Sequence, residues 1–485
     1  MFRSWGAAPG RPASEIIFLA NIKMAGGLMQ LVAYGAQDVY LTGNPKVTFF
    51  QAVYKRHTNF AMELIQQTTN GSPSSSGRVS VTIARNGDLV GNMHVALTPT
   101  SNVLTSNNSG FDTNWVAERA IAAVELTIGG QRIDKHYQTW WRLYAEVFLN
   151  ESDKYAWGKM TTAANPTATG TSALSPSKVY LPLLFFFNRN PGLYLPLIAL
   201  QYHEVRLDFD LTAYYASYFG TGNAFEVWAN YVYLDTEERR RFAQKGHEYL
   251  IEQVQHTGGD QLATSNFTEG SVQLIRLSFN HPVKELVWCY TNPLGSATAQ
   301  LNAMWNFCTS TGNVNVTSNV LTLQASNNYV MPNVTGVPQL ISTAGVIQAN
   351  IGLAGGVSGN AFWVEQGTQL LGGAGPGVEV GPLHLFKVIL NGQDRFKEQL
   401  GNYFNQVQPF YHHTGTPYPG IYVYSFALQP EEHQPTGTCN FSRIDNAQVS
   451  VQMKSNNAAT LQKLFAVNYN ILRIQSGMGG LAFSN

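Results

Sequence analysis

Apolar and polar residues alternate along much of this chain, and a two-residue period is that of a β-strand with one buried face. The clearest case is the segment 204–211. Its apolar positions are Val205, Leu207, Phe209 and Leu211, and its polar positions are Glu204, Arg206, Asp208 and Asp210. We expect the first set to lie in a core and the second in water. Helical periodicity is scarce, so the pattern predicts a protein built mainly from β-strands.

A hairpin is predicted between residues 79 and 97. Val79–Ile83 alternates, Asn86-Gly87 follows, and Leu89–Leu97 carries Met93 and Val95 on a single parity. Asn-Gly is the preferred two-residue hairpin turn, because both positions of that turn need a positive φ.

Three short helices are expected beside the strands. Asn44-Pro45 offers a cap and a first-turn proline to a helix that runs to about Tyr54. A second helix is predicted at Tyr137–Leu149, where Trp141, Tyr144 and Phe148 lie on one stripe. The third begins near Asp235-Thr236, with acidic residues at its positive end and three arginines after them. This charged segment is the candidate linker between domains.

The length of 485 residues favours two domains, since a single core stops growing at about 250–300 residues. The two halves also share a short pattern. Val124–Gln131 is a predicted strand with a Gly129-Gly130 turn and aromatic residues after it, and Leu385–Gln393 repeats this with an Asn391-Gly392 turn. We interpret the chain as an internal duplication.

Charge is balanced and sparse. Lys and Arg together number 30, as do Asp and Glu, so the whole chain has no net field to attract nucleic acid. Charged residues make up 12%, against roughly 25% in an average soluble domain. With so few charges, either much of the surface meets other subunits, or Asn, Thr, Ser and Gln replace charged residues as the groups that contact water. The segment 291–378 carries Glu365 as its single charged residue, and we expect an ordered, strand-bearing insertion there.

Other sequence signals are weak. Cys289, Cys308 and Cys439 are widely spaced and lack metal-site partners, which favours free thiols in a reducing compartment. The apolar stretch Val179–Leu200 is interrupted by prolines and a polar turn, so it is not expected to span a membrane. The first 23 residues contain too short an apolar stretch for a signal peptide, and Met24 is an alternative start.

No catalytic fingerprint is present, and no catalytic, cofactor-binding or metal-ligating residue and no cofactor is expected. Several groups were weighed as sites, and the structural interpretation is favoured for each. Adjacent histidines on a strand would face opposite sides, which argues against a shared metal. The groups weighed are His412-His413 and His433 with Glu431 and Glu432, His281, the basic Lys55-Arg56-His57, the carboxylates Asp208 and Asp210, and the Gly-rich 352–359 and 372–377.

Ordered motifs along the chain resemble the major capsid proteins of nucleocytoplasmic large DNA viruses, from about Gly27 to the C-terminus. The motifs are Gly35–Gly43, Tyr54–Phe60, Ile128–Asp134, Phe187–Gly192 with Leu195–Val205, Phe279–Leu286, Gly420–Leu428 and Pro435–Asn446. Their number and order carry the resemblance.

The resemblance implies an all-β chain of two consecutive eight-stranded antiparallel jelly rolls with short helices. We expect a leader at 1–26 that is open to disorder, a base segment at 27–60, a first jelly roll at 61–235, a linker at 236–268 and a second jelly roll at 269–485 with a long insertion at about 291–378. It further implies a structural, non-enzymatic homotrimer that forms pseudo-hexagonal capsomers of an icosahedral virion shell, assembled in the host cytoplasm.

The implied partners are neighbouring capsomers and minor capsid proteins, with the internal viral membrane and glycans on outer loops left open. No sequence-specific nucleic-acid binding is expected. Two alternatives remain at this point, a less abundant capsid paralogue and a carbohydrate-binding or carbohydrate-cleaving jelly-roll protein in which Asp208 with Asp210, or Glu431 with Glu432, would be the acids.

Overall fold

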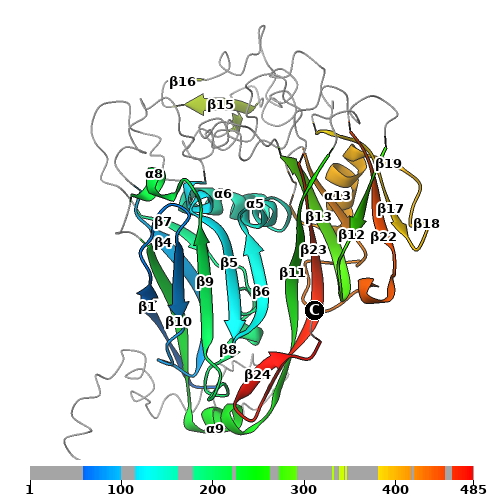
Figure 1. The fold of residues 1–485 in the computed structure, drawn as a ribbon. Helices are drawn as coiled ribbons and strands as arrows, with labels where there is room; N and C mark the ends of the chain where they lie inside the picture. The colour runs from blue at the N-terminus through cyan, green and yellow to red at the C-terminus, as the bar shows by residue number, and fades with distance from the viewer. Residues whose placement is uncertain are drawn as a thin grey trace, which may run out of the picture.

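The computed structural model describes residues 58–99, 115–161, 178–220, 225–262, 272–291, 381–415, 417, 420–453 and 461–483, and the backbone of three short strands between 330 and 346. In these residues the chain forms two β-sandwiches that stand side by side (Figure 1). Helices are short and lie mainly at the ends of the sandwiches. The expected all-β class is confirmed.

The first sandwich consists of two five-stranded antiparallel sheets. One sheet has the order β1 (Phe60–Gln67), β10 (Phe225–Leu234), β4 (Leu89–Leu97) and β7 (Val179–Pro182), with β8 (Leu195–Pro196) beside β4. The other has the order β2 (Thr69–Asn70), β3 (Arg78–Thr82), β9 (Val205–Leu211), β5 (Ile121–Ile128) and β6 (Gln131–Tyr137).

The second sandwich is built in the same way from the second half of the chain. Its first sheet has the order β11 (His247–Gln261), β23 (Leu461–Gln475), β13 (Pro282–Thr291) and β20 (Ile421–Ser425), with β21 (Cys439–Asn440) beside β13 and β24 (Met478–Leu481) beside β23. Its second sheet has the order β12 (Gln273–Leu277), β22 (Ala447–Met453), β17 (Leu383–Leu390) and β18 (Gln393–Asp394), with β19 (Gln399–Leu400) beside β17.

The two sandwiches repeat one topology. In the first sheet of each barrel, the last long strand of the barrel lies between two of its early strands. β10 lies between β1 and β4, and β23 lies between β11 and β13. The hairpins suggested as a repeat occupy the same place in both, β5–β6 in the first sandwich and β17–β18 in the second. Their turn residues Gly129, Gly130, Asn391 and Gly392 all have positive φ. This strand order is that of a jelly roll, so each half folds as one barrel.

The hairpin predicted at 79–97 is wrong, although its strands exist. β3 pairs with β9 and β4 pairs with β10, so the two strands belong to opposite sheets of the first barrel. The Asn86-Gly87 turn therefore carries the chain from one sheet to the other. A Cβ on Gly87 would lie 2.9 Å from the Cβ of Tyr231, so the glycine serves close packing against β10.

The alternation in β9 is confirmed for its apolar positions, all of which are buried. The expectation that Asp208 faces water is wrong, because its side chain is only 2% exposed. β9 is a central strand, and the carboxylate is covered by Arg78 at 3.3 Å, Arg206 at 2.9 Å and the hydroxyl of Ser80 at 2.6 Å. Asp210 lies at the barrel surface, 3.7 Å from Arg78.

Two of the three predicted helices are present, and the one expected at 44–54 lies outside the described residues. The second is α5 (Gln138–Val147) and the third is α9 (Thr236–Gln244). The other helices among the described residues are η1 (Val116–Arg119), α6 (Glu151–Thr161), α7 (Phe186–Arg189), η2 (Pro191–Leu193), α8 (Tyr215–Phe219), η6 (Tyr403–Val407), α13 (Gln408–His412) and η7 (Phe441–Arg443).

Within the expected linker 236–268, α9 is followed by β11, which pairs with β23 along its length. Most of the described part of that segment is thus sheet. The expected insertion at 291–378 lies largely outside the described residues, which include only the strands β14 (Val330–Pro332), β15 (Pro338–Ser342) and β16 (Gly345–Val346). No described helix is long and apolar enough to cross a membrane.

Two clusters of buried apolar side chains form the cores of the barrels. One fills the second barrel, where Trp288 stacks on Phe386 with ring centroids 4.4 Å apart. The other fills the first barrel and continues into strands of the second, since it includes Ile251, Val287 and Phe465. The barrels are therefore joined by a shared core, which we call the seam.

Candidate functional site: the seam between the barrels

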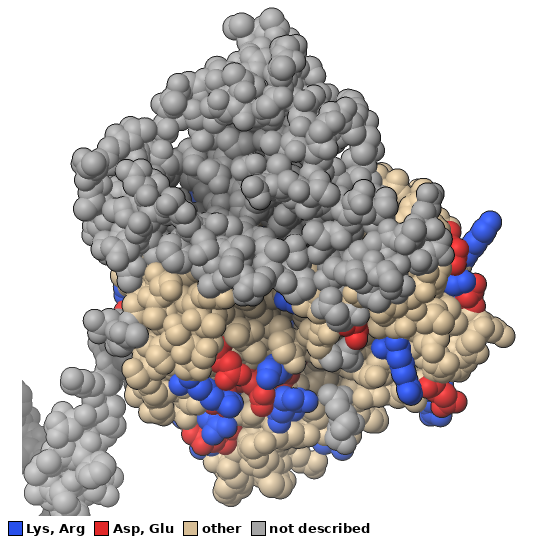
Figure 2. All heavy atoms as spheres, turned by 45° about the horizontal axis from the view of Figure 1, so that its top comes forward, with Lys and Arg blue, Asp and Glu red and all other residues tan. Residues whose placement is uncertain are grey.

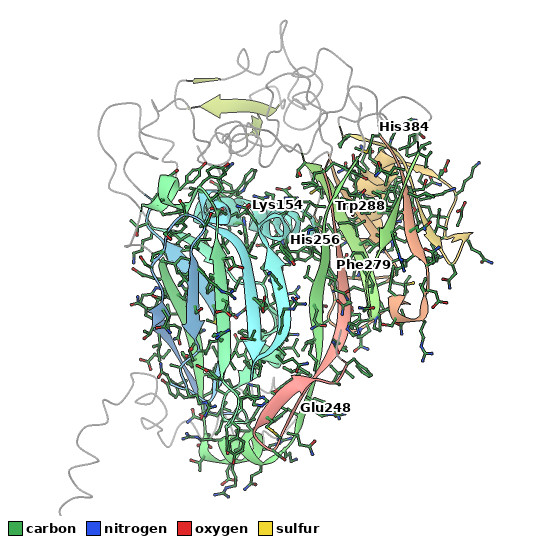
Figure 3. All side chains as sticks on the ribbon, viewed as in Figure 1. Lys154, Glu248, His256, Phe279, Trp288 and His384 are labelled. Atoms are coloured by element: carbon green, nitrogen blue, oxygen red, sulfur yellow. The ribbon has the colours of Figure 1, made fainter. Side chains whose placement is uncertain are left out.

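Aromatic side chains form the centre of the seam. Phe465 of β23 is fully buried and stacks on His256 of β11 with ring centroids 4.3 Å apart. From the first barrel, Trp140 of α5 approaches Phe465 at 5.5 Å and Tyr137 of β6 approaches His256 at 5.0 Å. Figure 3 places His256 between the two barrels, and Trp288 within the second. The edge strand β6 and α5 of the first barrel thus rest on the first sheet of the second barrel.

Backbone and side-chain hydrogen bonds fix the register of this contact. The carboxylate of Asp134 in β6 accepts from the backbone N–H of Val254 in β11, at 3.1 Å. The side-chain amide of Gln253 donates to the carbonyl of Ile133. Each bond links one strand of one barrel to a strand of the other, so the two sheets cannot slide along each other without breaking them.

A cluster of three charged side chains, Glu252, Lys284 and Arg189, also crosses the seam, and we call it the clamp. Glu252 of β11 accepts from Lys284 of β13 at 2.6 Å and pairs with Arg189 of α7, from the first barrel, at 3.0 Å. The side chains of Glu252 and Lys284 are 9% and 2% exposed. Burial would raise the pKa of Glu252, but the two cations lower it below its ordinary value. Lys284 also donates to the carbonyl of Pro430 at 2.7 Å.

A cavity of about 350 Å³ lies against the clamp. Its lining includes Arg189, Glu252 and Lys284, together with Tyr144 and His433. Solvent therefore reaches the Arg189 side of the clamp, where the arginine side chain is 25% exposed. His433, which the sequence offered as a metal ligand, lines this cavity.

His413 forms a second buried charged group at the seam. Its ring lies 3.1 Å from a carboxylate oxygen of Glu285 and 3.3 Å from one of Glu431. The ring of Phe148, the residue directly after α5, meets it edge to face with centroids 5.3 Å apart. Burial alone would lower the pKa of His413, but the two carboxylates raise it to about 9. The same imidazolium lowers the pKa of Glu431, against the effect of burial.

The pKa of His413 predicts a loss of stability at alkaline pH. Because the pKa of His413 is higher in the folded chain than in the unfolded chain, protonated His413 stabilises the fold. This stabilisation is complete below the unfolded-state pKa of 6.5 and is lost as the pH rises through about 9. We expect the free energy of unfolding to fall by up to about 3 kcal/mol between pH 7 and pH 10 from this group. Urea denaturation at both pH values measures it.

Two variants isolate this contribution. His413→Gln should flatten the alkaline fall in stability. His412→Gln should leave it unchanged, because His412 bonds to an uncharged group, the carbonyl of Leu428, at the surface, at 2.9 Å. An equal fall in both variants would assign the pH dependence to other groups.

A third network anchors α5 to the first barrel. Arg142 lies 3.2 Å from Glu118 and 3.0 Å from Glu146, and all three side chains are at most 2% exposed. Trp157 of α6 donates to the same oxygen of Glu118 at 2.6 Å. Burial raises the pKa of Glu118, and Arg142 and Trp157 oppose this shift. The network holds the helix that presents Trp140 to the seam.

The structure brings some of the candidates for chemistry together: His413 pairs with Glu431, and Glu431 and His433 line the cavity beside the clamp. His412 ends α13, so the expectation that the two histidines lie on a strand is wrong. The described residues contain no group of three or more His, Cys, Asp or Glu positioned to hold a metal ion. Cys289 is buried, which raises the pKa of its thiol to about 12, while Cys439 is partly exposed. Lys55-Arg56-His57, Cys308 and the Gly-rich segments lie outside the described residues.

Surface charge is sparse and mixed. Figure 2 shows Lys, Arg, Asp and Glu gathered in a few small groups of both signs, on a described surface that is otherwise uncharged. One such exposed pair is Lys178 with Glu226, 2.6 Å apart. The described part of this face has no extended basic area of the kind that follows a nucleic-acid backbone.

Comparison with known proteins identifies the family. A model described as "Large eukaryotic DNA virus major capsid protein" matches residues 238–480, and one described as "Major capsid protein N-terminus" matches 48–235. The chain belongs to this capsid family. The two matches meet at the start of α9, between the barrels.

Whole-length relatives agree. The chain is 43% identical to the major capsid protein of Paramecium bursaria Chlorella virus 1 and 39% identical to that of Phaeocystis pouchetii virus, in each case over 95% of this chain and 100% of the relative. A chain from a quasi-atomic model of the PBCV-1 virus capsid superposes with a TM-score of 0.66 at 38% identity, covering 90% of this chain and 100% of that chain. The protein is thus a structural major capsid protein with a double jelly-roll fold, not an enzyme, and its place is the virion shell.

Sequence reasoning missed the seam. Glu252 and His256 were not selected, because a carboxylate or a histidine on a long alternating strand has no local signal for burial. Arg189 lies within the motif Phe187–Gly192, and Lys284 and Glu285 lie within Phe279–Leu286. Lys284 and Glu285 directly precede the apolar run Leu286–Trp288, and charged residues beside such a run were the available signal, since they are rarely buried without partners.

Proposed function

We propose that three copies of this chain form a pseudo-hexagonal capsomer, and that such capsomers tile an icosahedral shell. The observation that carries the proposal is the repeated topology of the two barrels, since three chains then supply six similar barrels around one axis. The sparse charge supports it as well, because burying few charges keeps the desolvation cost of a large interface low.

The remaining parts of the proposal follow the family. We place residues 1–26 as a leader, 27–60 as a segment at the capsomer base, and the two barrels at 61–235 and 269–485, with a connection at 236–268 and an outer insertion at about 291–378. Neighbouring capsomers, minor capsid proteins and the internal viral membrane are the proposed partners. Assembly is proposed in the host cytoplasm.

Light scattering of the purified chain during size-exclusion chromatography tests the trimer. We expect three times the chain mass of 53.4 kDa, and a hexagonal outline in electron micrographs of the same peak. A stable monomer at micromolar concentration would rule the trimer out.

A further inference from the structure

The cavity beside the clamp has the size of a small-molecule site. Its volume is about 350 Å³, within the range of roughly 300–1,000 Å³ that such sites occupy. Charged lining residues come from both barrels, Arg189 from the first and Glu252 and Lys284 from the second. The apolar part of the lining consists of Tyr144, Phe148, Phe186, Pro191 and Leu193. A pocket with an apolar lining and a few charged groups is typical of a site for a small ligand.

Aromatic rings at the end of α5 adjoin the charged part of the cavity. Tyr144 and Phe148 stack with ring centroids 5.1 Å apart, and both side chains are half-buried. The guanidinium carbon of Arg189 lies 5.8 Å from the centroid of the Tyr144 ring. A ligand whose charged group lies one or two bonds from an apolar ring can therefore reach Arg189 and the aromatic residues together.

Arg189 has hydrogen-bond donors to spare. A guanidinium carries five N–H groups. Nη2 donates to Glu252 at 3.0 Å, whereas Nε is buried and has no hydrogen-bond partner in the described part of the chain. Leaving a buried donor unpaired costs free energy. The side chain lines the cavity and is 25% exposed, so the acceptor that completes its hydrogen bonds can enter from there.

The charge of the clamp favours a ligand with one negative charge. Lys284 and Arg189 both pair with the single carboxylate of Glu252, at 2.6 and 3.0 Å, so the clamp has two cations and one anion. Glu431, another carboxylate of the lining, pairs with His413 at 3.3 Å. A monoanion balances the clamp. A dianion such as phosphate would place its second charge beside Glu252 and Glu431, which disfavours it.

We propose that the cavity binds a small organic carboxylate with an aromatic body. The carboxylate accepts hydrogen bonds from Arg189, including the one from the unpaired Nε, because a planar carboxylate matches the guanidinium in geometry. The aromatic body packs among Tyr144, Phe148 and Phe186. Such a ligand touches both barrels, so its binding stabilises the seam as well as the folded chain.

Isothermal titration calorimetry on the purified full chain tests the site with three probes. Indole-3-acetate carries the ring and the carboxylate, indole-3-ethanol carries the ring with an uncharged hydroxyl, and acetate lacks the ring. We expect a Kd of about 1 mM or below for indole-3-acetate, and binding at least about 10-fold weaker for the other two. A Kd for indole-3-ethanol equal to that for indole-3-acetate, or no heat from indole-3-acetate at about 10 mM, would overturn the proposal.

Two variants identify the groups that bind. Arg189→Lys keeps a positive charge beside Glu252 but loses the planar donor group, so the preference for the acid over the alcohol should fall from about 10-fold to below about 3-fold. Tyr144→Leu keeps the ion pairs of the clamp and removes a ring, so the Kd for indole-3-acetate should rise about 5-fold. This second variant retains the test if Arg189→Lys does not fold.

Each variant has a matched control at a position that does not line the cavity. Arg239→Lys alters another arginine that pairs with a buried carboxylate, that of Asp88, at 3.0 Å. Tyr155→Leu alters another half-buried tyrosine beside a cation, since the ammonium of Lys159 lies 4.4 Å from its ring centroid. Both controls should bind indole-3-acetate as the wild type does. The inference fails if a control loses as much affinity as the variant that it matches, or if Arg189→Lys and Tyr144→Leu bind like the wild type.

Discussion

Replacing Glu252 by glutamine is expected to lower the free energy of unfolding by about 3–5 kcal/mol. The change leaves Lys284 and Arg189 facing a neutral amide, and the Lys284 side chain is only 2% exposed. A buried ammonium without its carboxylate keeps the cost of desolvation and loses the attraction that offset it. Urea denaturation at fixed protein concentration measures the loss.

Glu248→Gln is the matched control, because Glu248 lies four residues before Glu252 on the same strand, at a position of the same parity. Glu248 pairs with Arg473 at 2.8 Å, but the two side chains are 61% and 56% exposed (Figure 3). An exposed pair contributes at most about 1 kcal/mol. Equal losses in the free energy of unfolding for Glu252→Gln and Glu248→Gln would show that the buried clamp stabilises the fold no more than an exposed ion pair does.

Truncating Phe465 to alanine is expected to cost about 3–5 kcal/mol. The ring is fully buried, stacks on His256 at 4.3 Å and meets Trp140 at 5.5 Å, so its removal leaves a cavity where the two barrels join. Because both barrels border that cavity, thermal unfolding should also become less cooperative, which calorimetry detects as a broader transition.

Phe483→Ala is the control for this variant, because it removes the same kind of side chain from a position that is 58% exposed. Its cost should stay within about 0.5 kcal/mol, as for surface substitutions in general. A small cost for Phe465→Ala, or a large one for Phe483→Ala, would contradict a seam held by its aromatic centre.

Alternation predicted the strands well because the side-chain period is a local property. It placed Val205, Leu207 and Phe209 in the core, and the aromatic stripe of α5 followed from helical spacing in the same way. The pairing of strands is a property of the whole fold. Asn86-Gly87 is compatible with a two-residue hairpin, yet the packing of Gly87 on Tyr231 belongs to a crossing between sheets.

The seam lay beyond the reach of local patterns for a related reason. Glu252, Lys284 and Arg189 come from three segments, and only the packing of two barrels shows that one carboxylate lies between two cations. Asp208 was placed in water by parity, and its burial depends on Arg78 and Arg206 covering it. The boundaries assigned to the domains remain a proposal.

The position of β23 in its sheet has a consequence for synthesis of the protein. This strand lies between β11 and β13, ends at Gln475 and supplies Phe465 to the seam. The second barrel therefore cannot close until the chain through Gln475 has left the ribosome, and pairing between strands so far apart in the sequence is slow. A prematurely terminated chain lacks a central strand and the seam together, so an incomplete product should be cleared as misfolded before it reaches a growing shell.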